Sequence, residues 1–390
     1  MKRVGRTALV MAAAAVAGSA GAQPKQVVTG PVATYWMSAQ TTSGFGGIGA
    51  LGAGAMGPGG GAPSLGSMLG GLMGGRQGPN WNRALILQLG SARKPSGQPA
   101  AEHVPPATLG AGPSLSLVTP KAQPAQRTEE TPEIPRDYQK PKGRMLIFWG
   151  CGEKARPGQP LVIDFATLAS GKPPPAAYTS LMQGLSLNPM QPPSPTRNAT
   201  YGEWPNEKAR TTVPPTGSLM GEHLVRGNYS PDIRFAMNAA QDFMPAVEMT
   251  TNRNNPTGSA QLGWAPVGGA TAYLASTMGG DGESVVFWSS SEVATMLFAL
   301  PDYMRPADIA RLIAQRALMS PQTTSCTVPQ EVVKAAPQSM FNLVAYGGEA
   351  NFTYPSRPAD PKVAWNIDWT VKVRYRSSTG GLLGMEMPSF

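Results

Sequence analysis

Short apolar runs, bounded by Gly, Pro, Asn and Ser, dominate the pattern of hydrophobic and polar positions in this chain. Runs of about four to eight residues with such boundaries are typical of β-strands, because helices usually need segments of at least about 10 residues. They predict strands at 84–89, 115–119, 145–149, 161–165, 233–237, 246–250, 260–264, 272–278, 284–289, 341–346, 351–354 and 369–376. The sequence therefore predicts a mainly β fold, with a β-sandwich-like body, long Gly/Pro-rich loops and one or two short helices.

Two segments carry helix signals. In the first, Pro306 stands at a first-turn position, and apolar residues follow it at helical spacing. In the second, 292–299, Ser289 and Glu292 match the pattern of a capping box. The apolar run of this second segment fits a strand equally well, so only the first helix is a firm expectation.

The last predicted strand alternates apolar and polar side chains without interruption. Its apolar side chains share one face: Trp369, Val371, Val373 and Tyr375. Three cations, Lys372, Arg374 and Arg376, stand on the other face, about 6.6 Å apart, which is twice the rise per strand residue. Such a row fits contact with the phosphates or carboxylates of an anionic envelope polymer. A solvated sheet face, or charges that prevent edge-to-edge aggregation, explains the row equally well.

The first 22 residues have the three-part layout of a secretory signal. A basic start precedes an apolar run, and small residues end the segment at Ala20-Gly21-Ala22. The apolar run is about 10 residues long, half of what a bilayer-spanning helix needs. We expect cleavage after Ala22 and no transmembrane span in the mature chain. Export would carry the protein to the periplasm, the surface or the medium of a bacterium.

Residues 44–75 hold 15 glycines and no charged side chain. Gly-rich chains are flexible because an ordered glycine loses more backbone entropy than any other residue, which indicates a disordered linker. The recurrence of Gly66, Gly70 and Gly74 also fits the close packing of helices, and hence self-association.

Composition divides the chain into regions. We expect a signal at 1–22, a Gly-rich disordered segment at 23–79, a β-rich region at 80–170, a Pro-rich linker at 171–217, a second β region at 218–300 and a helix with C-terminal strands at 301–390. The Pro-rich linker is expected because prolines interrupt the hydrogen-bond ladder of a sheet. Whether the β regions form one body or two is open.

The charge balance is mildly basic. The whole chain has a net charge of +9, and removal of the three cations of the signal leaves 29 Lys and Arg against 23 Asp and Glu, or +6. This excess falls short of the basic footprint of nucleic-acid-binding proteins, so we expect no nucleic acid partner. An envelope polymer or a protein is the partner class that remains, and the oligomeric state is open.

The only two cysteines of the chain are Cys151 and Cys326. In an oxidising compartment an even pair predicts a disulfide, and a loop of this length gives about 5 kcal/mol of stabilisation in the chain-entropy model. Two unpaired buried thiols are the alternative. A catalytic or metal-bound thiol is disfavoured, since His103 and His223 are the only histidines that could assist it. We therefore expect no metal site and no cofactor.

The segment 262–276 has a Trp at one strand end, Trp264, and a Tyr on the next strand, Tyr273, with a Gly-Ala turn between them. In this it resembles two consecutive strands of a fibronectin type III-like sandwich, and the resemblance extends over 245–290. It implies a rigid binding or spacer module in which Trp264 and Tyr273 belong to the core. After Ser290 the chain departs from the family pattern.

None of the catalytic motifs that we considered is complete in this sequence. Ser91 and Lys94 match S-x-x-K, but Pro95 follows at once, and the chain has no G-x-S-x-G, H-E-x-x-H or C-x-x-C. A hydrolase that uses paired carboxylates needs no local motif, and its candidates are acidic residues of the predicted β regions: Glu203, Asp281 and Glu283.

The sequence thus predicts an exported bacterial envelope protein with a non-catalytic structural or binding role. Two alternatives stay open at this stage. One is a carboxylate-dependent hydrolase that acts on envelope carbohydrate or peptide. The other is a self-assembling or membrane-active protein that works through its Gly-rich segment.

Overall fold

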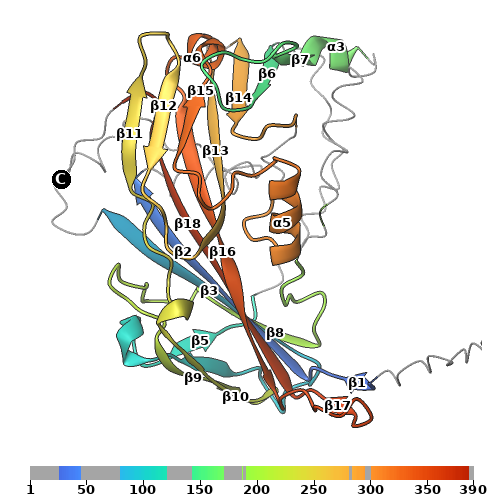
Figure 1. Cartoon of the computed structure of the whole chain (residues 1–390). Helices are drawn as coiled ribbons and strands as arrows, with labels where there is room; N and C mark the ends of the chain where they lie inside the picture. The colour runs from blue at the N-terminus through green and yellow to red at the C-terminus, as the bar shows by residue number, and fades with distance from the viewer. Residues whose placement is uncertain are drawn as a thin grey trace, which may run out of the picture.

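The computed structural model of the protein describes residues 26–44, 80–120, 143–170, 187, 190–280, 283–294 and 300–385 (Figure 1). The predicted signal at 1–22 and residues 45–75 of the Gly-rich segment lie outside the described residues. The fold is mainly β, which confirms the fold class predicted from the apolar runs. The described residues include three short α-helices.

The strands in chain order are β1 (Val28–Thr29), β2 (Ala33–Gly44), β3 (Trp81–Ser91), β4 (Ala101–Val104), β5 (Leu115–Leu117), β6 (Arg144–Trp149), β7 (Leu161–Asp164), β8 (Thr200–Trp204), β9 (Gly221–Gly227), β10 (Ser230–Met237), β11 (Met249–Asn254), β12 (Ala260–Trp264), β13 (Ala270–Gly280), β14 (Ser284–Ser289), β15 (Ser325–Val328), β16 (Met340–Tyr354), β17 (Trp365–Asn366) and β18 (Trp369–Leu382). The helices are α3 (Phe165–Ala169), α5 (Pro306–Ala314) and α6 (Gln330–Ala335).

Nine strands form one mixed sheet in the order β7-β6-β14-β13-β16-β18-β2-β3-β8. The pairs β6–β14 and β18–β2 are parallel, and the other neighbours are antiparallel. Strands from the regions predicted at 80–170, 218–300 and 301–390 all enter this sheet. The three regions therefore build one body.

Two smaller sheets cover one face of the nine-stranded sheet, which we call the inner face and which carries Tyr35 and Met37 of β2. The four-stranded sheet, β10-β9-β4-β5, lies at the lower end in Figure 1, and the three-stranded sheet, β11-β12-β15, lies at the upper end. The two-stranded pair β1–β17 lies at the bottom of the view. This layering is that of a β-sandwich.

Strands β8 and β2 correct the region boundaries expected from composition. β8 falls inside the segment 171–217 that was expected to be a linker, yet it pairs with β3 at the edge of the nine-stranded sheet. β2 falls inside the segment 23–79 that was expected to be disordered, yet it is an interior strand that pairs with both β18 and β3. Its alternate side chains Tyr35, Met37 and Ala39 are almost fully buried. Ser43 of β2 stands opposite Trp81 of β3, so the described chain leaves and re-enters the sheet at adjacent positions on either side of residues 45–79.

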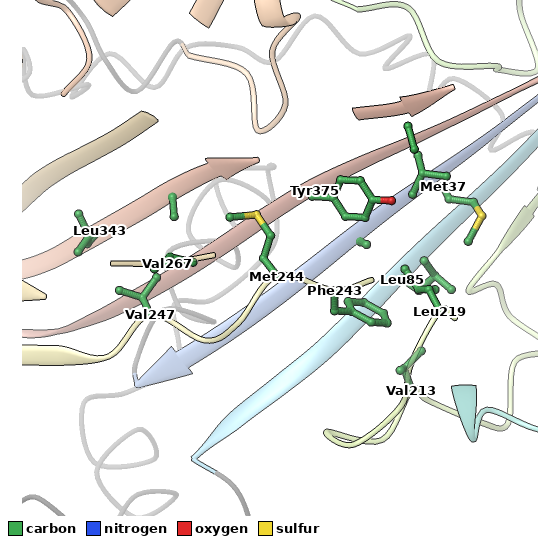
Figure 2. Close-up of a cluster of buried hydrophobic side chains, with 14 of the residues drawn as sticks. Met37, Leu85, Val213, Leu219, Phe243, Met244, Val247, Val267, Leu343 and Tyr375 are labelled. Atoms are coloured by element: carbon green, nitrogen blue, oxygen red, sulfur yellow. The ribbon is translucent and has the colours of Figure 1, made fainter. Parts of the chain in front are cut away.

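The core lies between the inner face and the smaller sheets (Figure 2). Met37, Leu85 and Tyr375 project from the long strands toward Phe243 and Leu219 of the covering layer. Alternation of apolar and polar side chains produces this arrangement, because one face of each long strand is buried and the next residue points the other way.

Polar side chains of the inner face support the irregular segment 241–247, which connects the two smaller sheets. Thr41 donates to the Met244 carbonyl at 2.7 Å, and Ser43 donates to the Val247 carbonyl at 2.8 Å. A similar hydroxyl bond, 2.8 Å long, joins Ser377 to Pro245. Buried carbonyls outside regular structure need such partners, so these hydroxyls allow a loop to run through the core.

Helix α5 begins at Pro306, as predicted, with proline in its first turn. Its Leu312 is fully buried and belongs to an apolar cluster with Leu274 and Val344, on the face opposite the inner face, which we call the outer face. The second predicted helix is not formed in its described part, 292–294. Glu292 binds Arg156 instead of capping a helix.

Two strand boundaries also differ from the prediction. The strands expected at 341–346 and 351–354 are one long strand, β16, with a register shift between Tyr346 and Glu349. The strand expected at 246–250 begins only at Met249, because the preceding residues form the core segment 241–247.

Candidate functional site

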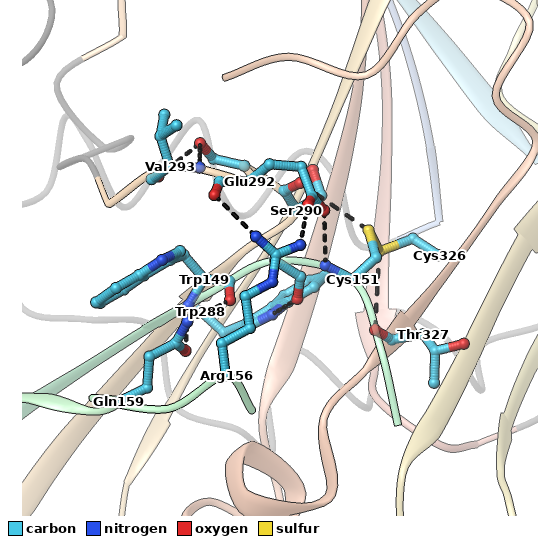
Figure 3. A network of polar contacts seen from close by, with 12 residues as sticks. Trp149, Cys151, Arg156, Gln159, Trp288, Ser290, Glu292, Val293, Cys326 and Thr327 are labelled. Atoms are coloured by element: carbon cyan, nitrogen blue, oxygen red, sulfur yellow. Dashed lines mark hydrogen bonds and ion pairs between the residues drawn. A yellow bond between two sulfur atoms is a disulfide. The ribbon is translucent and has the colours of Figure 1, made fainter. Parts of the chain in front are cut away.

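The predicted disulfide is present between Cys151 and Cys326, with their Cα atoms 5.4 Å apart (Figure 3). Cys151 follows β6 of the nine-stranded sheet, and Cys326 lies on β15 of the three-stranded sheet. The bond therefore joins two layers of the sandwich across a sequence separation of 175 residues. This covalent link limits how far the two sheets can separate at the upper end of the molecule.

A polar network holds the turn that carries Cys151 (Figure 3). The indole nitrogen of Trp288 donates to the Gly150 carbonyl at 2.9 Å. Arg156 forms an ion pair with Glu292, whose other carboxylate oxygen accepts from the Cys151 amide at 3.4 Å. Gly150 has a φ of +91°, a conformation that favours glycine. The disulfide thus belongs to a turn that is fixed on several sides.

The predicted cations lie on one face of β18, the outer face, as the alternation required. Lys372 forms an ion pair with Glu349 at 2.6 Å, and its ammonium nitrogen lies 5.8 Å from the centre of the Trp36 ring. The Lys372 side chain is 22% exposed and that of Glu349 is 17% exposed. Lys372 is therefore paired, yet reachable from solvent.

Arg374 is held between two aromatic rings. Its guanidinium carbon lies 5.0 Å from the centre of the Trp36 ring and 4.4 Å from that of Tyr303. The Nε group donates to the Ser38 hydroxyl at 2.6 Å. Burial lowers the pKa of Arg374 and raises that of Tyr303 to about 12. The arginine joins the segment that precedes α5 to the sheet.

Arg376 is buried and forms an ion pair with Asp302, which belongs to the same segment before α5. Arg374 and Arg376 thus both contact the segment before α5, Arg374 partly exposed and Arg376 buried, and carboxylates balance two of the three charges. Contact of Lys372, Arg374 and Arg376 with an anionic polymer stays a prediction. The geometry gives the row a second role, which is to fix the α5 segment on the outer face.

Both histidines of the chain meet inside the sandwich, an arrangement that the sequence analysis did not anticipate. His103 of β4 and His223 of β9 are 0% and 1% exposed, and a ring nitrogen of each lies 2.9 Å from the other. The hydroxyl of Tyr35, on β2, lies 2.5 Å from Nδ1 of His103. Phe235 stacks on the His223 ring with centres 4.8 Å apart.

The direction of these hydrogen bonds follows from one acceptor. The Leu219 carbonyl can only accept, so Nε2 of His223, 2.7 Å away, carries a proton. The Nδ1 atom of a neutral His223 is then bare and accepts from Nε2 of His103. Nδ1 of His103 is bare in turn and accepts from the Tyr35 hydroxyl. Every ring nitrogen is satisfied when both imidazoles are neutral.

Burial favours this neutral state. Desolvation lowers the pKa of His103 well below its usual value, and the neighbouring His223 lowers it further. Desolvation also lowers the pKa of His223 and raises that of Tyr35. A charged imidazole would leave water for an apolar interior, which is why the neutral forms are preferred there.

The carboxylates considered for a hydrolase do not meet. Glu203 lies on β8 at one edge of the nine-stranded sheet, and Glu283 directly precedes β14, six strands away in the sheet order. At about 4.8 Å per strand this separation is near 29 Å, whereas paired-carboxylate hydrolysis needs roughly 5–10 Å. Asp281 lies outside the described residues.

Within the described part of the chain, no group of three or more His, Cys, Asp or Glu side chains could hold a metal ion. None of the helices described is long and apolar enough to cross a membrane. A shallow groove on the four-stranded sheet carries Glu102, Arg226 and Asp232, and the first two form an ion pair at 2.6 Å.

No protein-family model, curated protein or solved structure matches this chain. The fibronectin type III-like resemblance of 245–290 therefore stays a prediction. Within that segment the Trp264 and Tyr273 rings pack with centres 5.6 Å apart, and both are buried in the core. β11 pairs antiparallel with β12, but β14 has the parallel neighbour β6, whereas sandwiches of that family have antiparallel sheets.

Proposed function

We propose that this protein is exported and serves a non-catalytic structural or binding role in the bacterial envelope. The disulfide Cys151–Cys326, which joins two sheets of a single body, is the observation that carries the proposal. Disulfides form and persist in oxidising compartments and are rare in the cytosol. The layout of residues 1–22 as a secretory signal supports the same compartment.

The use of polar side chains within the fold supports a non-catalytic role. His103 and His223 satisfy one another and the Leu219 carbonyl in the interior. Lys372 and Arg376 have carboxylate partners of the same chain. No observation favours the hydrolase alternative over this role, because Glu203 and Glu283 belong to distant strands.

Export and disulfide formation are tested together by expression of two chains in a bacterial host. One is the full chain, and the other lacks residues 2–22. We expect the full chain to be recovered oxidised from the envelope, and the shortened chain to remain in the cytosol with free thiols. The shortened chain should be less stable to urea by about 2–5 kcal/mol, the usual cost of losing such a disulfide.

A Cys151→Ser/Cys326→Ser variant of the full chain is the matched control, because it separates export from oxidation. It should reach the envelope with the stability of the shortened chain. Recovery of the full chain from the cytosol, with both thiols reactive, would contradict the proposal.

The proposal extends to contact with an anionic envelope polymer at Lys372, a partly exposed member of the cation row whose ammonium group is not covered by the segment before α5. Retention of the protein on heparin, a model polyanion, measures such contact. Lys372→Gln should elute at lower salt than the wild type, since one cationic contact is lost and such contacts are salt-dependent.

Lys362→Gln is the control for this measurement. Lys362 is exposed in the loop between β16 and β17 and is not part of the cation row, and its substitution changes the net charge equally. If both variants elute at the same salt concentration, Lys372 does not make the contact, and only the structural role of the cation row is left.

A further inference from the structure

The Tyr35–His103–His223 chain connects two layers of the sandwich. Tyr35 belongs to β2 of the nine-stranded sheet, and both histidines belong to the four-stranded sheet. The three side chains are at most 1% exposed. The disulfide joins a different pair of layers, so among the described residues no disulfide ties the four-stranded sheet to the large one.

The surroundings of the two imidazoles provide little that could stabilise a positive charge. Apolar side chains of the inner face and of the four-stranded sheet surround them: Leu89, Val371, Phe352, Phe235, Val225 and Leu115. The charged residues of the same strands alternate with the histidines and point to the other face of the small sheet: Glu102, Glu222, Arg226, Asp232 and Arg234.

The buried tyrosines near the two histidines stay neutral in mild acid. Burial raises the pKa values of Tyr35 and of two further tyrosines of the core, Tyr229 and Tyr375, so all three are neutral. The carboxylate of Asp242 accepts from the Leu219 amide at 2.7 Å, and the carbonyl of the same residue accepts from His223. The ordinary pKa of an imidazole lies within the range from pH 7 to pH 5, so the histidines are groups that respond to this change.

One added proton breaks the hydrogen-bond chain. On His223 it would sit on Nδ1 and face the Nε2 proton of His103, so two donors would meet across 2.9 Å. On His103 it would sit on Nδ1 and face the Tyr35 hydroxyl, which would have to turn its own proton away. Either site would also place an uncompensated charge in an apolar interior.

We propose that the Tyr35–His103–His223 chain is an acid-sensitive contact that releases the four-stranded sheet from the nine-stranded sheet when the surroundings of the protein become acidic. Release hydrates the imidazoles and exposes the apolar inner face beneath them. The disulfide keeps the three-stranded sheet attached at the other end, so opening is local and reversible. An exported protein meets external pH directly, which gives such a contact a use.

The sign and size of the effect follow from linkage. A histidine in the open state has its ordinary pKa of about 6.5, whereas the closed state binds no proton until lower pH. Above pH 6.5 neither state is protonated and the opening equilibrium is constant. Below it, the open population rises by up to about tenfold per pH unit for each histidine.

The chain has only two histidines, so the imidazole NMR signals of wild-type protein carrying a histidine-free tag come from these two rings alone. We expect neither imidazole to titrate near pH 6.5 in the closed state. A second set of signals, from protonated imidazoles in the open state, should grow as the pH falls to 5. Titration of both rings near pH 6.5, with the fold unchanged, would overturn the proposal.

Hydrogen exchange, corrected for the intrinsic effect of pH on exchange, locates the opening. Between pH 7.5 and 5, protection should fall at least tenfold in β4 and β9 and stay constant in β16 and β18. In His103→Gln/His223→Gln the fall should disappear, whereas Tyr35→Phe should keep it because both imidazoles remain. Equal loss of protection in all strands, or an unchanged pH response in the double glutamine variant, would contradict a local contact controlled by the histidines.

Discussion

Arg374 is a residue that was predicted to contact a partner but that stabilises the fold through contacts within the chain. Its guanidinium group contacts Trp36 and Tyr303 and donates to Ser38, so it links β2, β18 and the segment before α5. The sequence correctly placed it in a row of cations on one face of a strand. The sequence did not predict the contact between Arg374 and the Tyr303 ring, because these residues are far apart in the chain.

A substitution at Arg374 should therefore lower stability although the charge is kept. Arg374→Lys removes the planar group that contacts both rings and bonds Ser38, and we expect the free energy of unfolding to fall by about 1–2 kcal/mol. Urea denaturation followed by tryptophan fluorescence measures this change. Arg253→Lys, at an exposed position of β11, is the control and should be neutral. Equal stability of the two variants would show that the aromatic contacts of Arg374 contribute nothing.

At the scale of secondary structure, strands with continuous apolar runs were predictable and strands with polar inward residues were not. β12 and β14 were predicted to the residue. β2 was missed because Thr41 and Ser43 interrupt its apolar pattern. These hydroxyls point inward and donate hydrogen bonds to carbonyls of the segment 241–247. Donor and acceptor are 203 and 204 residues apart in the sequence. Local pattern cannot reveal such a partner.

The same reasoning explains the site that sequence analysis missed. His103 and His223 are 120 residues apart, and each stands alone in its strand. Metal and catalytic motifs were the only reasons to connect them, and neither motif is present. A pairing with Tyr35 becomes visible only once β4, β9 and β2 have been brought together by the packing of two sheets.

The hairpin β2–β3 makes a prediction about the Gly-rich segment. Its flanking residues Ser43 and Trp81 are cross-strand neighbours, so a short Asn-Gly turn in place of residues 45–79 should close the same hairpin. A shorter loop has a lower closure cost, by about 0.6 kcal/mol for each halving of its length, so thermal stability should be equal or higher. Size-exclusion chromatography with light scattering should give the same number of subunits per particle.

A Gly/Ser segment of the original length is the control, because it changes composition without changing loop length. If both variants lose subunits relative to the wild type, the Gly-rich sequence drives self-association. That result would favour the self-assembly alternative over the structural or binding role proposed above.

At the scale of the whole molecule, two of the connections between the covering sheets and the nine-stranded sheet differ in their chemistry. At the upper end the covalent bond between Cys151 and Cys326 is insensitive to pH and sensitive to reductant. At the lower end the buried Tyr35–His103–His223 chain is sensitive to acid. Reductant should therefore loosen the upper end and acid the lower end. This difference requires that Cys151 and Cys326 are bonded to each other.

The central claim is that the mature protein is an exported body whose two cysteines are bonded to each other. Intact mass spectrometry of the protein from the envelope fraction of its own cells, after thiol alkylation with and without prior reduction, tests it directly. The account predicts a chain that begins at Gln23, takes up no alkyl group before reduction and takes up two after it. A chain that retains Met1, or that is alkylated at both cysteines before reduction, would contradict it.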